Sequence, residues 1–369
     1  MAVLTYKCAN CGGPLTWDAK KQAYFCDYCN SSFTQEEVAK MRPESAAAQQ
    51  SSEDLKRPAD VDTGMQSSGD AGADHAPGAV QYNCPSCGAQ IMTDETTAAT
   101  YCYYCHNPVV LADRLSGAFL PDCVIPFEID EKKAREIFLS WVKRHRYIPK
   151  DFYNEKQIGH LSGVYFPYWI YNCQVDGKIE GDGKRLRTWV TGSLQFTETS
   201  VYDISRSGVM QIDNVMRIAL KKASRVLCEG VMPFQTAKMR PFSTAYLQGY
   251  TAEMRDVEKD GLSAEVEAEV KRFAEEKLKA QAEEGYNSAD IRSAETHIDS
   301  QSWRYALLPV WTLTYTDAKS GKLYYFSING QSGKTCGELP VDRRRLLGLF
   351  AMVFFPAFVI LLLLIGFLF

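Results

Sequence analysis

The sequence predicts two small cysteine-rich β ribbons, an α+β domain with antiparallel strands, and a single C-terminal transmembrane helix. Three observations predict this fold class: a cysteine pattern that occurs twice, strand and helix patterns between the second copy and the C-terminus, and a long apolar run at the end of the chain. The expected parts are a first ribbon at 1–33, a disordered linker at 34–80, a second ribbon at 81–112, the α+β domain at 122–340 and the transmembrane helix at 346–369.

The cysteine pattern carries the clearest chemistry. Each copy has two C-x-x-C pairs separated by fourteen residues, and the second copy lies 76 positions after the first. Each pair turns two thiolates toward one point, and a hairpin returns the second pair, so this spacing is typical of a β ribbon closed by a four-cysteine zinc site. The predicted ligands of the two zinc ions, one per ribbon, are Cys8, Cys11, Cys26 and Cys29, and Cys84, Cys87, Cys102 and Cys105.

Two alternatives stay open for these cysteines. Disulfides would require an oxidising compartment, and the N-terminal residues lack the apolar segment of an export signal. A rubredoxin-like iron site is also compatible, because four thiolates do not select a metal by ligand type alone.

The residues between the two ribbons have a different composition. Residues 34–80 are rich in Ala, Ser, Gln, Gly, Asp and Pro and contain almost no large apolar side chains. Such a segment cannot bury enough apolar surface to offset its ordering entropy, so we expect a flexible linker. A short helix over Thr34–Met41 is expected at its start.

The first helix of the α+β domain is expected at about 131–146. Apolar residues recur at helical spacing from Ala134 to Val142 and predict one buried face. The remaining surface is basic, which fits either an ordinary solvated face or a contact with an anionic surface, such as lipid headgroups or an acidic partner. The candidate contact residues are Lys132, Lys133, Arg135, Lys143, Arg144 and Arg146.

Further elements follow from local patterns. The aromatic, β-branched run at 164–175 predicts a strand, and glycines at 177, 181 and 183 are turn signals. The remaining expected elements are strands within 188–204, a helix over 213–227, a long charged helix over 262–284 with an apolar stripe at Val266, Val270 and Phe273, a hairpin of 305–316 with 322–328, and a short returning strand that ends at 337.

The C-terminal run predicts the membrane topology. Residues 346–369 carry no charge and would span about 36 Å as a helix, against about 30 Å for a hydrocarbon core. The preceding Arg343, Arg344 and Arg345 predict, by the positive-inside rule, a flank on the cytoplasmic side. We therefore expect a tail-anchored, single-pass protein of the cell membrane, with its N-terminal body in the cytoplasm.

Recognisable catalytic motifs are missing from the sequence. The run from Gly330 to Lys334 has too few residues between its glycines for a P-loop and reads as a pair of β-turns. The five histidines form no paired ligand spacing, and there is no nucleophile or paired-carboxylate motif. We therefore expect that the protein is not an enzyme.

The charge pattern argues against nucleic-acid binding. The net charge is −4, and the second ribbon has no Lys or Arg between 81 and 110, although phosphate contacts depend on these residues. A membrane-tethered nucleic-acid-binding regulator is kept as the alternative function.

Several sequence blocks resemble a bacterial family of TFIIB-type zinc-ribbon membrane proteins, whose members are sometimes named after primosomal helicases. The blocks are Pro126-Phe127, the aromatic run from Gly163 to Trp169, and the segments at 241–247, 305–311 and 329–342. The resemblance implies partners among phage-shock-type or SPFH-like proteins of membrane-stress systems.

Together these features predict a membrane-anchored, zinc-binding adaptor that recruits proteins at the cytoplasmic face. The residues expected to contact partners lie inside the C-x-x-C pairs: Ala9, Asn10, Asp27, Tyr28, Tyr103 and Tyr104.

Overall fold

The computed structural model describes residues 3–41, 44–45, 79–145, 148–317 and 321–368. Most of the predicted linker, residues 46–78, and the candidate contact residue Arg146 lie outside these ranges. The described chain forms two compact units. Unit 1 contains 1–166, 222–254 and 307–369, and unit 2 contains 167–221 and 255–306.

The first ribbon belongs to unit 1. Its elements are β1 (Val3–Thr5), β2 (Thr16–Asp18), β3 (Ala23–Phe25), β4 (Ser32–Phe33), α1 (Gln35–Lys40) and β5 (Glu44–Ser45). Strands β2, β3 and β4 form a small antiparallel sheet. Thr34 and Glu37 form a reciprocal cap at the start of α1, which confirms the short helix expected there.

The second ribbon is divided between two sheets. Strands β6 (Ala79–Asn83) and β7 (Gln90–Asp94) form a separate hairpin. Strands β8 (Thr97–Tyr101) and β9 (Pro108–Leu111) form a second hairpin, and this one joins the large sheet of unit 1. Strand β8 pairs with β14 (Thr251–Glu253), and β9 pairs with β1 of the first ribbon.

The large sheet of unit 1 has the strand order β13-β10-β15-β11-β14-β8-β9-β1-β5, with β16 on β15 and β17 on β16. Its further strands are β10 (Cys123–Val124), β13 (Arg240–Pro241), β16 (Leu323–Asn329), β17 (Thr335–Gly337), and the unit 1 parts of β11 (Ser162–Thr191) and β15 (Ser288–Thr316). Besides α1, the described α-helices of unit 1 are α3 (Glu131–Arg144), α4 (Glu155–Ile158), α5 (Arg225–Gly230) and α7 (Arg343–Leu368).

The expected antiparallel sheet is instead a mixed one. Strands β11 and β14 pair in parallel, with Val164 opposite Thr251. A parallel pair requires a long connection between its strands, and the chain makes this connection through unit 2. The prediction of an antiparallel α+β domain was therefore wrong, because it treated neighbouring strands as simple hairpins.

Helix α3 fulfils the amphipathic pattern expected of it. Asp130 caps its first turn, and Ala134, Phe138 and Val142 are buried. The helix ends at Arg144 because His145 adopts an extended backbone. The expected hairpin before residue 328 and the returning strand to Gly337 are also present as β15, β16 and β17.

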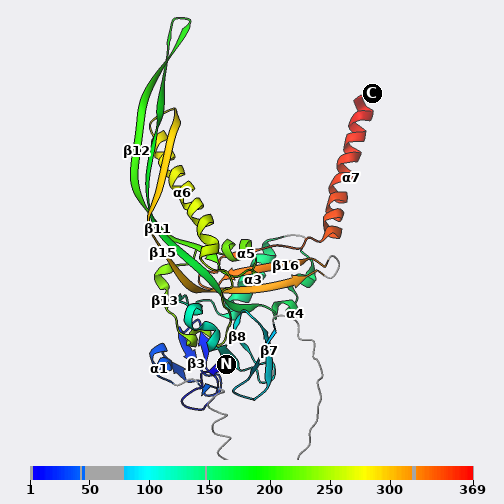
Figure 1. Cartoon of the computed structure of the whole chain (residues 1–369). Helices are drawn as coiled ribbons and strands as arrows, with labels where there is room; N and C mark the ends of the chain where they lie inside the picture. Colours follow the sequence, from blue (N-terminus) through cyan, green and yellow to red (C-terminus); the bar gives the residue numbers. More distant parts are fainter. Residues whose placement is uncertain (1–2, 42–43, 46–78, 146–147, 318–320, 369) are drawn as a thin grey trace, which may run out of the picture. The chain divides into compact units, whose positions relative to one another are not determined.

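Unit 2 is built on the long hairpin of β11 and β12 (Leu194–Ile218), with part of β15 and the helix α6 (Asp260–Glu283). Helix α6 runs alongside this hairpin (Figure 1). It buries Val266, Val270, Ala274, Leu278 and Ala282, all four residues apart, against the strands. Phe273, which we placed in this stripe, is exposed.

Two expectations for unit 2 were wrong. The helix expected over 213–227 is replaced by strand up to Ile218, and the glycines read as turn signals lie inside β11. These glycines allow close approach rather than turning. A Cβ at Gly181 would lie 2.4 Å from the carbonyl oxygen of Asp290, and one at Gly177 would lie 2.6 Å from Leu278.

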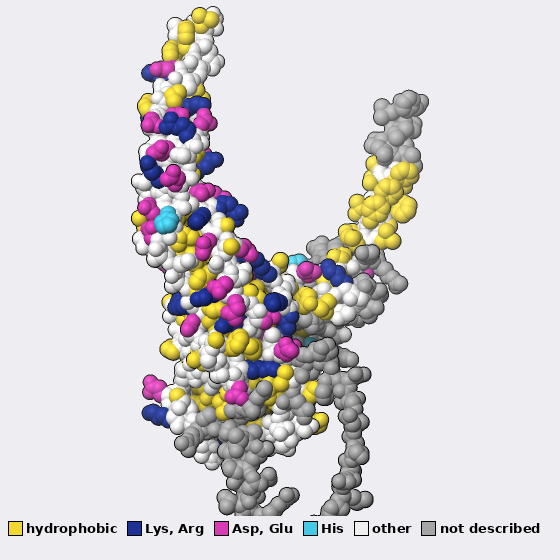
Figure 2. All heavy atoms as spheres, viewed as in Figure 1, with side chains coloured by type: hydrophobic (Ala, Val, Ile, Leu, Met, Phe, Trp, Pro, Cys, Tyr) yellow, Lys and Arg dark blue, Asp and Glu magenta, His cyan; other side chains and the backbone are white. Residues whose placement is uncertain are grey.

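The surface of unit 2 mixes both signs of charge along the hairpin and α6, whereas the end of the hairpin shows hydrophobic and uncharged polar groups (Figure 2). The exposed apolar residues at that end include Trp189, Val190, Leu194 and Phe196. The rings of Trp189 and Phe196 stack across the two strands with centroids 5.7 Å apart.

Helix α7 corrects the membrane prediction. Over the residues that the structure describes, no helix offers an apolar stretch long enough to cross a membrane. The side chains described in α7 beyond the arginine triplet run from 346 to 360, about 22 Å at about 1.5 Å per residue. The predictions of a transmembrane helix at 346–369 and of a single-pass protein of the cell membrane with a cytoplasmic body were therefore wrong.

Candidate metal centres

Each predicted set of four cysteines converges on one point. In both sets the four Sγ atoms lie within 4.8 Å of one another. In the first ribbon, the Sγ atoms of Cys8 and Cys29, and of Cys11 and Cys26, are 3.5 Å apart. In the second, the Cys84–Cys105 and Cys87–Cys102 Sγ separations are 3.7 Å.

These separations fit a tetrahedral metal ion. A Zn–S bond of about 2.3 Å places two sulfurs of a tetrahedron about 3.8 Å apart. A disulfide would require about 2.05 Å, and the eight cysteines are free thiols in the structure. The donor set of each ribbon therefore suits one metal ion.

The backbone builds all four C-x-x-C pairs in the same way. The carbonyl of the first cysteine in each pair accepts a hydrogen bond from the N–H of the residue four positions later in the chain. The N–H of that cysteine donates to the carbonyl of the residue five positions later. The residue four positions later has a positive φ in every case: Gly12 (72°), Asn30 (57°), Gly88 (75°) and His106 (56°). This left-handed residue closes the loop around the metal position.

The role of Asn30 and His106 in closing these loops was not among the features expected from the sequence. His106 is a loop-closing residue and not one of the four clustered ligands. The signal was present in the repeat, because Asn30 and His106 correspond after the shift of 76 positions, as do Gly12 and Gly88. Asn and His are more tolerant of the left-handed region than most residues other than glycine.

Hydrogen bonds lower the pKa of two of the clustered cysteines, which favours their thiolate form. Hydrogen bonds from the Ser31 hydroxyl and the Ser31 backbone lower the pKa of Cys29 to about 6. Burial raises the pKa of Cys102, but hydrogen bonds from the backbone of Cys105 and Tyr104 outweigh this effect and lower it to about 7. Thiolates are the form that binds a metal.

The neighbouring sulfurs also oppose full ionisation in the absence of a cation. Burial and the other three cysteine sulfurs raise the pKa of Cys105 to about 12, despite a backbone hydrogen bond from Asn107. Four thiolates this close together repel one another. A divalent cation at the centre would remove this repulsion, so the electrostatics agree with the distances.

The first ribbon is attached to the core of unit 1 by specific contacts. The Trp17 indole N–H and the Gln22 side-chain amide both donate to the carbonyl oxygen of Phe127, at 3.3 and 2.8 Å. The Trp17 ring also packs edge-on against Tyr24 and Tyr246. The ribbon is therefore part of the core packing of unit 1.

The second ribbon has a small core of its own. The clustered cysteines Cys84 and Cys102 pack with apolar side chains from β6, β7 and β9, and the second cysteine of each pair is more exposed. The members of this core are Tyr82, Cys84, Ile91, Cys102, Val109 and Leu111.

The predicted contact residues inside the C-x-x-C pairs lie on the surface. Tyr28, Tyr103 and Tyr104 are 75%, 68% and 72% exposed, and Ala9, Asn10 and Asp27 are exposed as well. The Tyr28 ring lies over Gly13, where an added Cβ would meet the ring at 2.9 Å. This glycine thus makes room for the tyrosine beside the metal position.

The basic residues predicted on α3 do not form one patch of free charges. Lys133 and Arg135 form ion pairs with Glu136 and Glu131 of the same helix, while Lys132, Lys143 and Arg144 are exposed. The side chains of Arg343, Arg344 and Arg345 lie outside the described residues.

Comparison with known proteins adds one curated relative without an assigned function. The uncharacterized protein YdjG of Bacillus subtilis (strain 168) is 26% identical over 349 residues, which covers 95% of this chain and 94% of that protein. No family model and no solved structure matches the chain.

Proposed function

We propose that this protein is a zinc-binding interaction protein, in which two four-cysteine sites hold tyrosine-bearing loops ready to contact a protein partner. The observation that carries the proposal is the high exposure of Tyr28, Tyr103 and Tyr104 on loops whose ends are metal ligands.

Zinc is the metal that the sites favour in this proposal. Structural zinc sites are commonly tetrahedral with four cysteines, and the Sγ separations of 3.5 and 3.7 Å lie near the expected value. Elemental analysis should find about two zinc ions per chain, and Cys84→Ser should lower this number to about one. A visible thiolate-to-iron absorption band, with iron in place of zinc, would contradict the assignment.

The loops have the properties of a contact surface. Tyrosine is enriched at interface hot spots because it offers a large apolar area with a polar tip. A loop closed by a metal and by repeated backbone hydrogen bonds loses little conformational freedom on binding. Tyrosines on such loops can therefore contribute binding energy with a small entropic cost.

The charges around the second ribbon favour a protein partner over a phosphate backbone. Between 81 and 110 there is no Lys or Arg. The nearby Arg114 already donates to the carbonyl oxygens of Asp94 and Thr97 and lies over the Tyr82 ring. The phage-shock-type and SPFH-like proteins suggested by sequence resemblance are the first candidates for this partner.

The test is affinity capture with the full chain after nuclease treatment. We expect a specific protein to be recovered, and to be lost with the double substitution Tyr103→Ser and Tyr104→Ser while zinc content stays at two. Val226→Ser is the control, because Val226 is 76% exposed on α5 outside the ribbons. Capture that survives the tyrosine substitutions would refute the proposal.

A further inference from the structure

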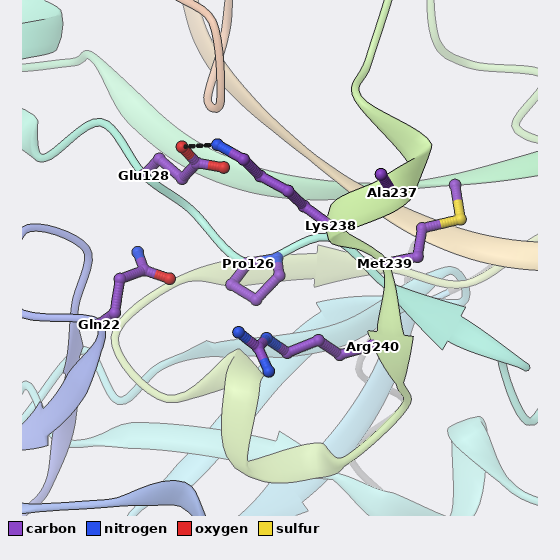
Figure 3. Close-up of a pocket in the computed structure, with 7 residues that line it drawn as sticks. All are labelled: Gln22, Pro126, Glu128, Ala237, Lys238, Met239 and Arg240. Carbon is purple, nitrogen blue, oxygen red and sulfur yellow. Dashed lines mark hydrogen bonds and ion pairs between the residues drawn. The ribbon is translucent and has the colours of Figure 1, made fainter.

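A small pocket lies between the first ribbon and the strand pair β10–β13 within unit 1. Its volume is about 230 Å³, and Figure 3 shows its residues converging from these elements. The lining residues are Gln22, Pro126, Glu128, Ala237, Lys238, Met239 and Arg240.

The charges in this pocket do not cancel. The Lys238 ammonium group and the Glu128 carboxylate form an ion pair at 2.8 Å on one side. Arg240 forms no ion pair with any carboxylate among the described residues. In Figure 3 its guanidinium group extends below Pro126 toward Gln22, apart from the Lys238–Glu128 pair. The pocket therefore has a net charge of about +1.

The fold fixes the backbone position of Arg240, whose side chain is exposed at the pocket. Arg240 pairs through its backbone with Val124 in the β10–β13 ladder. The adjacent Met239 thioether is held 3.8 Å from the Sγ atom of Cys123, and with Pro126 and Ala237 it gives the pocket apolar walls. A cation beside apolar side chains in a pocket of mixed lining suits an anionic group on an aliphatic stem.

The first ribbon supplies the opposite wall. Gln22 has a φ of 51°, and its side-chain amide donates to the carbonyl oxygens of Ala19 and Phe127 at 2.6 and 2.8 Å. Gln22 follows the first pair of cysteines and precedes the second, so a metal ion bound by both pairs would restrain the segment that carries this wall.

We propose that this pocket binds a carboxylate group through Arg240, and that binding depends on the metal in the first ribbon. A planar guanidinium group can donate two parallel hydrogen bonds to a carboxylate. The net charge of about +1 matches a single carboxylate, whereas Glu128 would repel the second charge of a phosphate dianion. The carboxylate belongs either to a small free acid or to an acidic side chain of a peptide.

The test follows the methyl NMR signal of Met239 in the full, metal-loaded chain labelled with [methyl-¹³C]methionine. The probes are butyrate, glutamate blocked at both its amino and α-carboxyl groups, and inorganic phosphate. We expect a saturable shift with both carboxylates, and tighter binding of one of them identifies a free acid or a side chain as the source. Tighter binding of phosphate would overturn the proposal.

Substitutions locate the site. Arg240→Gln should weaken carboxylate binding about tenfold or more, through loss of a charge-assisted hydrogen-bonded pair. Arg206→Gln, an exposed arginine of unit 2, is the matched control and should leave the affinity unchanged. Equal affinities in the wild type and the Arg240→Gln variant would overturn the proposal.

Two further variants test whether carboxylate binding depends on the metal in the first ribbon. Cys11→Ser in the first ribbon should abolish the shift. Gln22→Ala, which leaves all cysteines in place, should weaken binding by removing the two contacts that hold the wall. Undiminished binding in both variants would overturn the coupling between the pocket and the metal site.

Discussion

Four left-handed residues close the metal loops, and two of them are not glycine. Gly12 and Gly88 adopt a positive φ without steric cost, but Asn30 and His106 carry a Cβ in the same conformation. A side chain in the left-handed region costs about 1–2 kcal/mol. The second loop of each ribbon therefore carries local strain that its backbone hydrogen bonds must offset.

This strain leads to a prediction for His106. We expect His106→Gly to stabilise or leave unchanged the second ribbon, and His106→Val to destabilise it by about 1–2 kcal/mol, because a β-branched residue tolerates positive φ poorly. Thermal unfolding of the zinc-loaded chain measures both effects. Loss of zinc on His106→Gly would instead mean that the imidazole is a ligand.

A second prediction concerns Asn329, which is fully buried. Its side-chain amide donates to the carbonyl oxygens of Val231 and Pro233, and its side-chain oxygen accepts from the N–H groups of Gln331 and Ser332. Removing this side chain leaves buried backbone groups without partners. We expect Asn329→Ala to lower the free energy of unfolding by about 2–4 kcal/mol.

Denaturant unfolding checks this prediction, with Ser332→Ala as the control. Ser332 is exposed in the same turn, so its substitution should cost less than about 0.5 kcal/mol. Similar losses for both variants would show that the turn, and not the buried amide, holds this region. The segment turns as expected, but its backbone bonds differ from those of a pair of β-turns: the N–H of Gly333 donates to the carbonyl of Asn329, and the N–H of Asn329 donates to the carbonyl of Lys334.

At the scale of elements, the glycines of β11 give the strand room for its neighbour. Gly181 is buried where the backbone of Asp290 approaches, whereas Gly208 on β12 has no atom within 4 Å of an added Cβ. We expect Gly181→Ala to destabilise unit 2 by about 1–3 kcal/mol, because backbone atoms cannot move aside cheaply. Gly208→Ala should be neutral, and hydrogen exchange of the β11 and β12 amides measures the difference. A neutral Gly181→Ala would contradict the close packing.

These glycines also show what a sequence can and cannot predict. The cysteine pairs and the stripe on α3 depend on local spacing. The sequence identified the clustered cysteines and the buried Ala134, Phe138 and Val142, whereas Ile137 and Trp141, also expected on the buried face, are partly exposed. A glycine inside a strand has the same local signature as a turn, and only the approach of Asp290 distinguishes the two. Residues 213–218 continue a strand because they pair with β11, a contact that no short window contains.

The whole molecule places both metal sites in one unit. All eight cysteine ligands lie in unit 1, and strands of both ribbons belong to its large sheet. The pairing of β8 with β14 and of β9 with β1 links the ribbons to strands distant in sequence. The sequence alone suggested separate ribbons, because pairing across such distances leaves no local pattern.

This arrangement predicts the outcome of metal removal. A zinc chelator should remove hydrogen-exchange protection from β8 and β14 in unit 1, because structural zinc contributes directly to folding. Helix α6 in unit 2 should stay protected, since its core contains no metal ligand. Exchange measured by mass spectrometry separates the two units. Simultaneous loss of protection in α6 would contradict this independence.

Unit 1 is built from three separate segments of the chain, so it can be completed during translation only after the last of them has been made. The N–H of Ile125 donates to the carbonyl of Leu307, and Phe127 packs against Trp311. At about 5–20 residues per second, a ribosome needs roughly 10–40 s to make the intervening segment. Unit 2 has all its residues before unit 1 does. Tyr165 and Tyr250 also pack against Phe127 and are made earlier, but the packing around this ring is complete only when Trp311 has followed the last residue of unit 2.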